Sequence, residues 1–259
     1  MPEGDTVWRT ARHLHEALAG RQLLLTDLRV PQYAALNLSG QVVDDAVSRG
    51  KHLLVHIGDR SLHTHLRMEG AWHIYRRGTA WRRPAHTARV VLQNADYQAV
   101  GFSLGIVEML ARRDEPAAFA HLGPDLLGAD WGLDEAVRRV GSEPDRSVFL
   151  ALHDQRNLAG FGNEYVNELC FLTGLLPTRR VGDVPDLRRM IERGRRMIEA
   201  NSRRVQRSFT GSLRAGEQHW VFAREHTTCR RCGTRLRSGH LGDHPTRLRN
   251  TFWCPHCQS

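Results

Sequence analysis

Hydrophobic residues near the start of the chain recur at intervals of three and four residues. These positions are Val7, Ala11, Leu14 and Leu18. The spacing predicts an amphipathic helix. Asp5 or Thr6 can cap its N-terminus, and Gly20 can end it in a left-handed conformation.

From about residue 21 to residue 110 the pattern becomes that of short strands. Residues 51–57 and 60–66 flank a turn at Gly58 and Asp59, which predicts a β-hairpin. Further strand-like runs cover residues 71–75, 88–93 and 97–102. Several short strands at this spacing predict a β-sandwich or a barrel.

The second half of the chain has helical patterns, beginning after a break at Gly123 and Pro124. Helices are predicted at residues 133–140, 146–155 and 164–172, with a longer one starting at Pro185. The outer face of the long helix carries Arg188, Arg189, Arg193, Arg195, Arg196, Arg203 and Arg204. Such a face is either solvated and ion-paired or in contact with DNA. The whole pattern predicts an α+β protein of more than one domain.

The charge balance narrows the classes of partner. The 259 residues carry a formal net charge of +9, from 37 basic and 28 acidic side chains, which favours polyanions and nucleic acid in particular. A solvated arginine-rich surface is the alternative. The sequence has no apolar run long enough for a membrane span, and it has no signal-peptide pattern. The chain is therefore expected in the cytoplasm. Lys51 is the only lysine, so an amine nucleophile would be Lys51 or the N-terminus.

Four of the five cysteines form two C-x-x-C pairs near the C-terminus. They are Cys229, Cys232, Cys254 and Cys257. Two such pairs supply the four thiolates of a tetrahedral, structural zinc site. Disulfides are the alternative, which a cytosolic location disfavours. The fifth, Cys170, lies on the apolar face of a predicted helix and is interpreted as a core thiol.

Histidines near these pairs offer substitute metal ligands, although a surface or phosphate-facing position is the simpler interpretation. They are His226, His240, His244 and His256. An arginine-rich hairpin between the two cysteine pairs would then face a partner.

The N-terminus carries a second chemical possibility. Pro2 follows Met1, and removal of Met1 would leave a secondary amine able to form an iminium with an aldehyde. Glu3 beside it is a possible proton donor. The alternative is an exposed, frayed terminus.

Four segments in order carry a resemblance to a known family. They are PEG at residues 2–4, SRGKHLL at 48–54, DQRNLAGFGNEY at 154–165 and RNTFWCPHCQ at 249–258. Together they resemble the formamidopyrimidine-DNA glycosylase and endonuclease VIII family of base-excision repair enzymes. The resemblance spans the chain from end to end.

The resemblance implies a β-sandwich lobe with an N-terminal helix, followed by a helical lobe with a helix–two-turn–helix and a four-cysteine zinc finger. We expect the sandwich lobe at residues 1–120, a hinge at 121–128, the helical lobe at 129–222 and the finger at 223–259. The implied partner is double-stranded DNA with damaged bases or abasic sites. The protein is expected to bind it as a monomer and not to associate with a membrane.

The resemblance also implies a mechanism. The Pro2 amine would attack C1′ of a flipped nucleotide, Glu3 would protonate the sugar ring oxygen, and β,δ-elimination would cut the strand. Lys51 and Arg249 would hold phosphates and assist elimination, and Asn163 would anchor the backbone. Without the motifs, the simpler interpretation of Lys51 is an exposed lysine, that of Arg249 is a surface arginine, and that of Asn163 is a helix N-cap.

Departures from the family patterns bear on the substrate. The purine-lesion branch starts Pro-Glu-Leu and carries an Asp-Pro-Arg-Arg-Phe-Gly loop, whereas Gly4 follows Glu3 here and residues 97–107 lack that loop. This favours the endonuclease VIII branch and oxidised pyrimidines. Met68 resembles the purine branch and would fill the gap left by the flipped base, unless it is a core methionine. Asp5 departs from the proline common in endonuclease VIII.

Two other functions stay open at this point. One is an 8-oxoguanine/formamidopyrimidine-specific glycosylase of the same family. The other is a zinc-containing DNA-binding protein without catalysis, which would be expected to have lost Pro2, Glu3, Lys51 or Arg249; all four are present.

Overall fold

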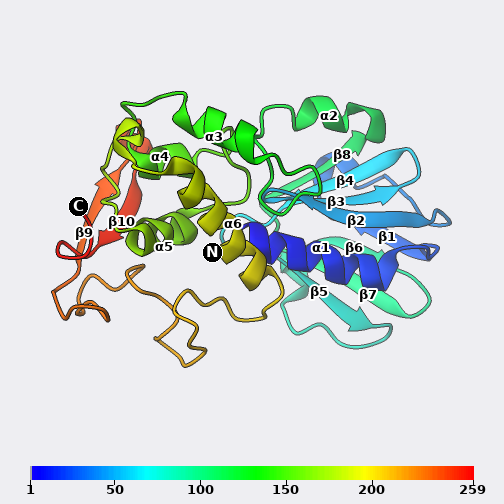
Figure 1. Cartoon of the computed structure of the whole chain (residues 1–259). Helices are drawn as coiled ribbons and strands as arrows, with labels where there is room; N and C mark the ends of the chain where they lie inside the picture. The colour runs from blue at the N-terminus through cyan, green and yellow to red at the C-terminus, as the bar shows by residue number, and fades with distance from the viewer. Residues whose placement is uncertain (1) are drawn as a thin grey trace. The chain divides into compact units, whose positions relative to one another are not determined.

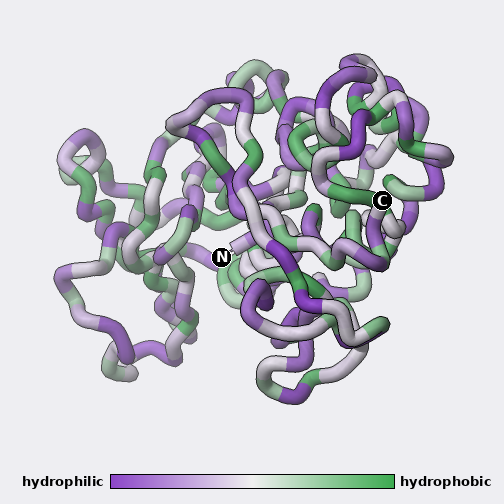
Figure 2. Tube along the Cα trace, turned by 90° about the vertical axis from the view of Figure 1, so that its left-hand side faces the viewer, coloured by the Kyte–Doolittle hydropathy of each residue, from purple (hydrophilic) through white to green (hydrophobic). Residues whose placement is uncertain are grey.

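The computed structural model describes residues 2–259. The chain divides into two compact units, one ending at His121 and the next beginning at Leu122. Within residues 2–259 no helix has the length and apolarity needed to cross a membrane. Hydrophobic and hydrophilic positions instead alternate at short intervals along the trace (Figure 2).

The N-terminal unit consists of one long helix and two four-stranded antiparallel sheets (Figure 1). The helix is α1 (Gly4–Leu18). The first sheet has the order β1 (Leu25–Leu28), β6 (Ala88–Gln93), β7 (Tyr97–Phe102), β5 (Ala71–Arg76). The second has the order β2 (Val43–Arg49), β3 (His52–Ile57), β4 (Arg60–His65), β8 (Ile106–Ala111). Short helical turns are η1 (Pro31–Tyr33), η2 (Ala85–Thr87), η3 (Arg112–Asp114) and α2 (Glu115–Ala118).

One apolar core joins α1 to both sheets. Val7 and Leu14 of α1 are buried in the same cluster as Leu53 of β3 and Leu92 of β6. Two separate sheets around one core confirm the predicted sandwich lobe. Gly20 has a positive φ of 72° just beyond the helix, as predicted. The N-cap is Glu3 rather than Asp5 or Thr6, so the helix begins at Gly4, two residues before the start that a cap at Asp5 would give.

The C-terminal unit is helical and ends in a β-hairpin. Its helices are α3 (Leu133–Gly141), α4 (Val148–His153), α5 (Asn163–Thr173) and α6 (Leu187–Ser202), with short turns η4 (Val181–Asp183) and η5 (Pro245–Arg247). The hairpin pairs β9 (Arg237–Leu241) with β10 (Arg249–Trp253). These elements confirm the predicted helical part followed by a cysteine-bearing end.

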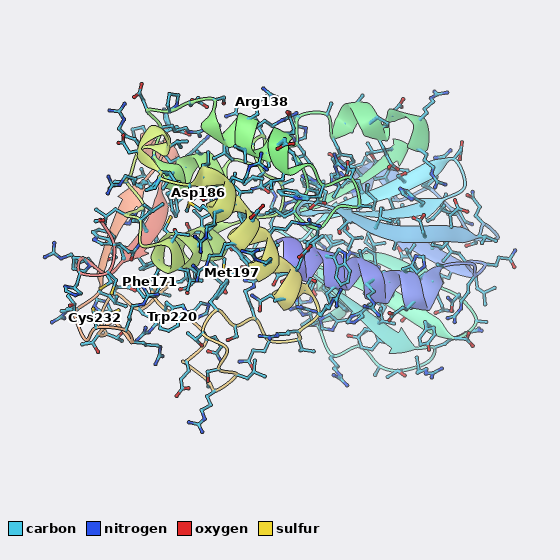
Figure 3. All side chains as sticks on the ribbon, in the orientation of Figure 1. Arg138, Phe171, Asp186, Met197, Trp220 and Cys232 are labelled. Atoms are coloured by element: carbon cyan, nitrogen blue, oxygen red, sulfur yellow. The ribbon has the colours of Figure 1, made fainter. Side chains whose placement is uncertain are left out.

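Two helices of this unit begin later than predicted. Helix α4 starts at Val148 because the Ser147 hydroxyl caps it by accepting a hydrogen bond from the Leu150 N–H. Helix α6 starts after Asp186 (labelled in Figure 3), whose carboxylate accepts a hydrogen bond from the Arg189 N–H at 2.8 Å. A capping side chain that satisfies a first-turn N–H marks the start of a helix more sharply than apolar spacing does.

The arginine face of α6 divides into two groups. Arg188 pairs with Asp134, and Arg195 pairs with Glu199 at 2.9 Å and lies over the Trp131 ring. Arg189 and Arg196 are exposed. The ion-paired interpretation therefore holds for the first group, and contact with DNA stays a prediction for the second.

Gly194 lies where α6 packs tightly against the rest of the unit. A Cβ at this position would lie 2.6 Å from Cζ of Phe161 and 2.9 Å from Cδ2 of Leu169. Phe161 and Leu169 are fully buried in the core of the unit. The helix can pack this closely only because residue 194 has no side chain.

We therefore predict that Gly194→Ala destabilises the protein by about 1–3 kcal/mol, although alanine favours helix by about 1 kcal/mol. Urea denaturation measures the change. Gly141→Ala is the matched control: this glycine also lies in a helix, and the nearest atom to its Cβ would be 3.6 Å away. Equal stability of the two variants would contradict the packing argument.

Candidate functional site

Pro2 and Glu3 directly precede helix α1. The Glu3 side chain is fully buried, and its backbone carbonyl accepts hydrogen bonds from the N–H groups of Thr6 and Val7, both at 3.0 Å. Met1, whose removal the sequence predicts, lies outside the described residues. The burial of Glu3 does not fit a frayed terminus. It holds a carboxyl group at a fixed position beside Pro2.

Lys51 lies in the turn between β2 and β3, where Gly50 has a φ of 57°. Its charge acts on two histidines of the neighbouring strands. Burial, followed by the charge of Lys51, lowers the pKa of His65 to about 4. Burial, followed by His63, His65, His121 and Lys51, lowers the pKa of His52 to about 3. Both imidazoles are therefore neutral near pH 7, and Lys51 and Arg67 are the cations that act on them.

Met68 lies in the turn between β4 and β5. Its side chain is 67% exposed, which rules out the alternative of a core methionine. The turn is tightly built, since Arg67 has a positive φ of 51° and a Cβ on Gly70 would lie 2.4 Å from the Leu66 carbonyl oxygen. The backbone thus presents Met68 outward.

Asn163 and Arg249 belong to elements of the C-terminal unit that are hydrogen-bonded to each other. Asn163 is the first residue of α5, and its side-chain amide donates to the carbonyl of Asn250 at 3.0 Å. Asn167, one turn later, donates to the same carbonyl at 3.2 Å and accepts from the Phe252 N–H at 2.7 Å. Arg249 is the exposed first residue of β10. Both residues named from the sequence are therefore brought close in space.

The loop that leads into α5 is held by its own side chains. Gln155 donates to the Phe161 carbonyl at 2.7 Å and accepts from the Gly160 N–H at 3.1 Å, where Gly160 has a φ of 115°. Asp154 accepts from Arg146 at 3.0 Å and from Arg156 at 2.6 Å. Burial favours protonation of Asp154, but the hydrogen bonds from Arg156 and Arg146 outweigh it and hold its pKa below the usual range.

Two buried glutamates of α5 are functional candidates that sequence reasoning missed. Glu168 accepts hydrogen bonds from the backbone N–H groups of Trp220, Val221 and Phe222 at 2.8–2.9 Å. Glu164 pairs with His219 at 2.8 Å and with Arg207. The signal for them in the sequence is the presence of two carboxylates, four residues apart, on an otherwise apolar helix.

These two glutamates bind the long segment after α6 to the helix. Trp220 of that segment also stacks on Phe171 of α5, with ring centres 5.4 Å apart (Figure 3). The segment is therefore ordered by buried polar contacts as well as by an aromatic contact.

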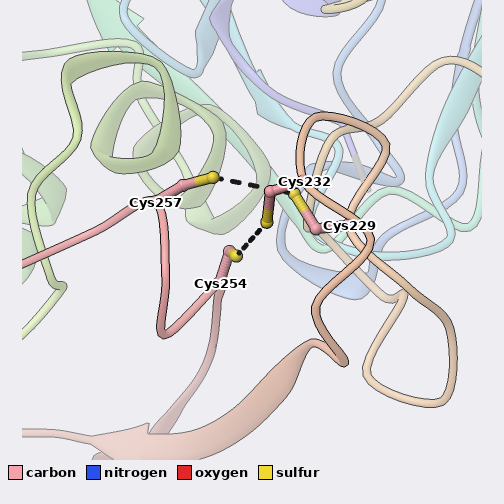
Figure 4. A group of neighbouring side chains, drawn as sticks. All are labelled: Cys229, Cys232, Cys254 and Cys257. Carbon is pink, nitrogen blue, oxygen red and sulfur yellow. Dashed lines mark hydrogen bonds between the residues drawn. The ribbon is translucent and has the colours of Figure 1, made fainter.

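The four cysteines converge on one point (Figure 4). All four Sγ atoms lie within 4.8 Å of one another, with Cys229 and Cys257 at 4.0 Å and Cys232 and Cys254 at 3.5 Å. Thiolates bound tetrahedrally at about 2.3 Å from zinc would be roughly 3.8 Å apart. The cluster fits a metal ion and is too wide for disulfides, in which the sulfurs are about 2.05 Å apart.

The other candidate ligands lie outside this cluster. Among residues 2–259 the convergent group consists of the four cysteines, without His226, His240, His244 or His256. Cys170 is fully buried, and burial raises its pKa to about 12, which fits an inert core thiol.

Comparisons with known proteins agree with this arrangement. The family model of the formamidopyrimidine-DNA glycosylase N-terminal domain matches residues 1–103. Over its whole length the chain is 48% identical to DNA-(apurinic or apyrimidinic site) lyase Nei2 of Mycolicibacterium smegmatis, covering 99% of that protein. It is 47% identical to Endonuclease 8 2 of Mycobacterium tuberculosis, covering all of it.

A solved structure shows the same fold. The formamidopyrimidine DNA glycosylase of Lactococcus lactis, bound to DNA with an abasic site, superposes with a TM-score of 0.81 at 20% identity, covering 99% of each chain. The chain is therefore a two-unit protein with the fold of that structure and a four-cysteine cluster near its C-terminus. The chain belongs to the formamidopyrimidine-DNA glycosylase and endonuclease VIII family.

The contacts of Asp154 predict an acid-dependent contribution to stability. A carboxyl group with a depressed pKa stabilises the folded state above its unfolded pKa of about 3.9, and this contribution is lost as the pH falls below that value. Asp154→Asn should therefore cost about 1–2 kcal/mol at pH 7, with the difference from wild type shrinking below pH 4. Urea denaturation at several pH values measures it.

The control is Asp145→Asn, which removes an exposed partner of Arg180 and should change stability by less than about 0.5 kcal/mol. A difference between Asp154→Asn and wild type that stays constant from pH 7 to pH 3 would contradict the assignment.

Proposed function

We propose that this protein is a DNA glycosylase that also cleaves the strand at the resulting abasic site, with the Pro2 amine as nucleophile. The amine attacks C1′ of a flipped nucleotide, the glycosidic bond breaks, and the base leaves with the bonding electrons. The observation that carries the proposal is the buried Glu3 carboxyl next to Pro2, in a chain similar end to end to relatives named as a lyase and an endonuclease.

Glu3 is proposed to protonate the ring oxygen of the sugar, which opens the ring and leaves an iminium on Pro2. Loss of a proton from C2′ then allows β-elimination of the 3′ phosphate, and δ-elimination releases the 5′ phosphate. Burial suits Glu3 for this work, since it holds the carboxyl group at a fixed position beside Pro2.

Lys51, Asn163 and Arg249 are proposed to bind the DNA backbone around the lesion. Lys51 is also proposed to donate a proton during elimination, because its ammonium can release one whereas arginine stays protonated near neutral pH. Arg249 offers a planar guanidinium for bidentate phosphate contact. Support for Asn163 and Arg249 acting together comes from the hydrogen bond between Asn163 and the carbonyl of Asn250, the residue next to Arg249.

We propose that oxidised pyrimidines are the substrate and that Met68 fills the space left by the flipped base. Strands β7 and β8 are separated only by residues 103–105, so there is no room there for the loop of the purine-lesion branch. Met68 suits its proposed role because it is exposed in a tight turn. The identity to proteins named endonuclease 8 supports the choice of oxidised pyrimidines.

The cysteine cluster is proposed to hold one structural zinc ion. Four sulfur ligands leave no open position for substrate, and the ion would fold the end of the chain that carries Arg249. We further propose the hinge at residues 121–128, the helical lobe at 129–222, the finger at 223–259, a monomeric state and a cytoplasmic, nucleoid-associated location.

Borohydride trapping tests the nucleophile and the substrate. Duplexes with an oxidised pyrimidine, 8-oxoguanine or an abasic site are incubated with the protein and borohydride, which reduces the iminium to a stable adduct. We expect adducts on the oxidised pyrimidine and the abasic site, located on Pro2 by peptide mapping. No adduct on any duplex would refute the enzyme, and trapping on 8-oxoguanine alone would refute the pyrimidine preference.

Glu3→Gln removes the proposed acid and should lower the rate of base removal by about 10²–10⁴-fold, while binding to abasic DNA is retained. Single-turnover kinetics measure the rate. Glu16→Gln is the control on the same helix, because Glu16 is exposed and forms an exposed ion pair with Arg12. An unchanged rate in Glu3→Gln would exclude its role as the acid.

Cys254→Ser should abolish zinc binding, which elemental analysis of the purified protein measures. Loss of the ion should also weaken DNA binding, because the hairpin around Arg249 loses its support. Cys170→Ser is the control, since Cys170 is buried away from the cluster and should keep one zinc per chain. Full zinc content in Cys254→Ser would contradict the ligand set.

A further inference from the structure

A group of histidines lies on the outer face of the sheet β2–β3–β4–β8. His52 of β3 pairs in register with His65 of β4, and His63 lies two residues before His65 on the same strand. The alternate residues Leu53 and Leu62 point into the core of the sandwich. The histidines therefore share the face of the sheet that points away from that core.

A hydrogen-bonded chain fixes the protonation of two of these rings. His63 Nδ1 lies 3.0 Å from a carboxylate oxygen of Glu108, which can only accept, so Nδ1 carries the proton. His63 Nε2 therefore accepts a hydrogen bond from Nδ1–H of His52 at 2.9 Å; an ion bound between these two nitrogens takes the place of that hydrogen, and the proton of His52 moves from Nδ1 to Nε2. A carboxylate behind the distal nitrogen of a histidine is the usual support of a metal-binding imidazole.

The tautomer of His121, the last residue of the N-terminal unit, is also fixed by a hydrogen bond. Its Nδ1 donates to the Ala118 carbonyl at 3.1 Å, which leaves the lone pair of Nε2 available. Phe119 of the same segment packs against both His52 and His63, with ring centres 5.2 Å apart in each case. The segment that carries His121 thus already covers the two histidines of the sheet.

We propose that His52, His63 and His121 form a second metal site, which takes a late first-row divalent cation such as nickel, copper or zinc. Imidazole nitrogens are ligands that these ions prefer. Two nitrogens at about 2.0–2.1 Å from one ion are about 2.9 Å apart when they bind at a right angle. That is the spacing of His52 and His63. Water completes the coordination.

One ligand has to move for this site to close. The ring centres of His52 and His121 are 6.5 Å apart; because His121 is exposed, its ring can turn towards the other two, exchanging the hydrogen bond to the Ala118 carbonyl for the bond to the ion. His65 is excluded as a ligand in its present state: its Nδ1 accepts the Arg67 N–H at 2.9 Å, which places the proton on Nε2.

The proposed ion would join the sheet to residues 118–121, directly before the C-terminal unit begins. The site is separate from the four cysteines and does not depend on the proposed glycosylase activity. Its consequence is a metal-dependent attachment of the connecting segment to the sandwich.

Nickel binding to the zinc-loaded, full-length protein tests the proposal. Isothermal titration with NiCl₂, followed by elemental analysis, should give one nickel per chain while the zinc content is retained. Glu108→Gln should weaken nickel binding by about 10–100-fold, as expected for loss of a supporting carboxylate. His121→Ala should weaken it by at least about tenfold. Both changes lie outside the apolar core, so folding is checked by circular dichroism.

His86→Ala is the matched control, because His86 is an exposed histidine of the same unit in η2. It should bind nickel as the wild type does. The proposal is overturned if the wild type binds no nickel below millimolar concentration, if nickel enters only by displacing zinc, or if either Glu108→Gln or His121→Ala binds as tightly as the wild type.

Discussion

The hydrogen bonds from Asn163 and Asn167 to the Asn250 carbonyl join the two parts of the C-terminal unit. One part is a helix whose first residue is the proposed backbone anchor. The other is a hairpin that has little apolar core and includes Arg249. Because two amide side chains one helical turn apart donate to the same carbonyl, the contact fixes the register of the hairpin against the helix. The proposed phosphate ligands of this unit therefore move as one body.

The catalytic candidates of the N-terminal unit depend on a different constraint, which is the rigid start of α1. Glu3 is both the N-cap of the helix and a buried side chain. A residue held by two kinds of contact loses little further entropy when a substrate binds. The terminal position of Pro2 would otherwise make it one of the most mobile residues in the chain.

Much of this architecture could be predicted from the sequence, because local patterns specify it. Helix α1, the hairpin of β3 and β4 and the cysteine cluster all come from spacing over a few residues. The start of α6 was misplaced at Pro185, since the cap by Asp186 is a side-chain contact that apolar spacing does not report. Glu164 and Glu168 were missed because their partners lie more than 40 residues away. Contacts between residues so far apart in the sequence form only in the folded unit, so local patterns do not reveal them.

The binding of the segment at residues 220–222 by Glu168 has an evolutionary consequence. The glutamate holds this segment through three backbone N–H groups, and every amino acid except proline provides that donor. The hydrogen bonds to Glu168 therefore place no demand on the side chains of the segment. That demand comes from Trp220, which stacks on Phe171 and donates to the Phe209 carbonyl, and from the buried Val221. A substitution in residues 220–222 that keeps these contacts leaves the path of the chain unchanged.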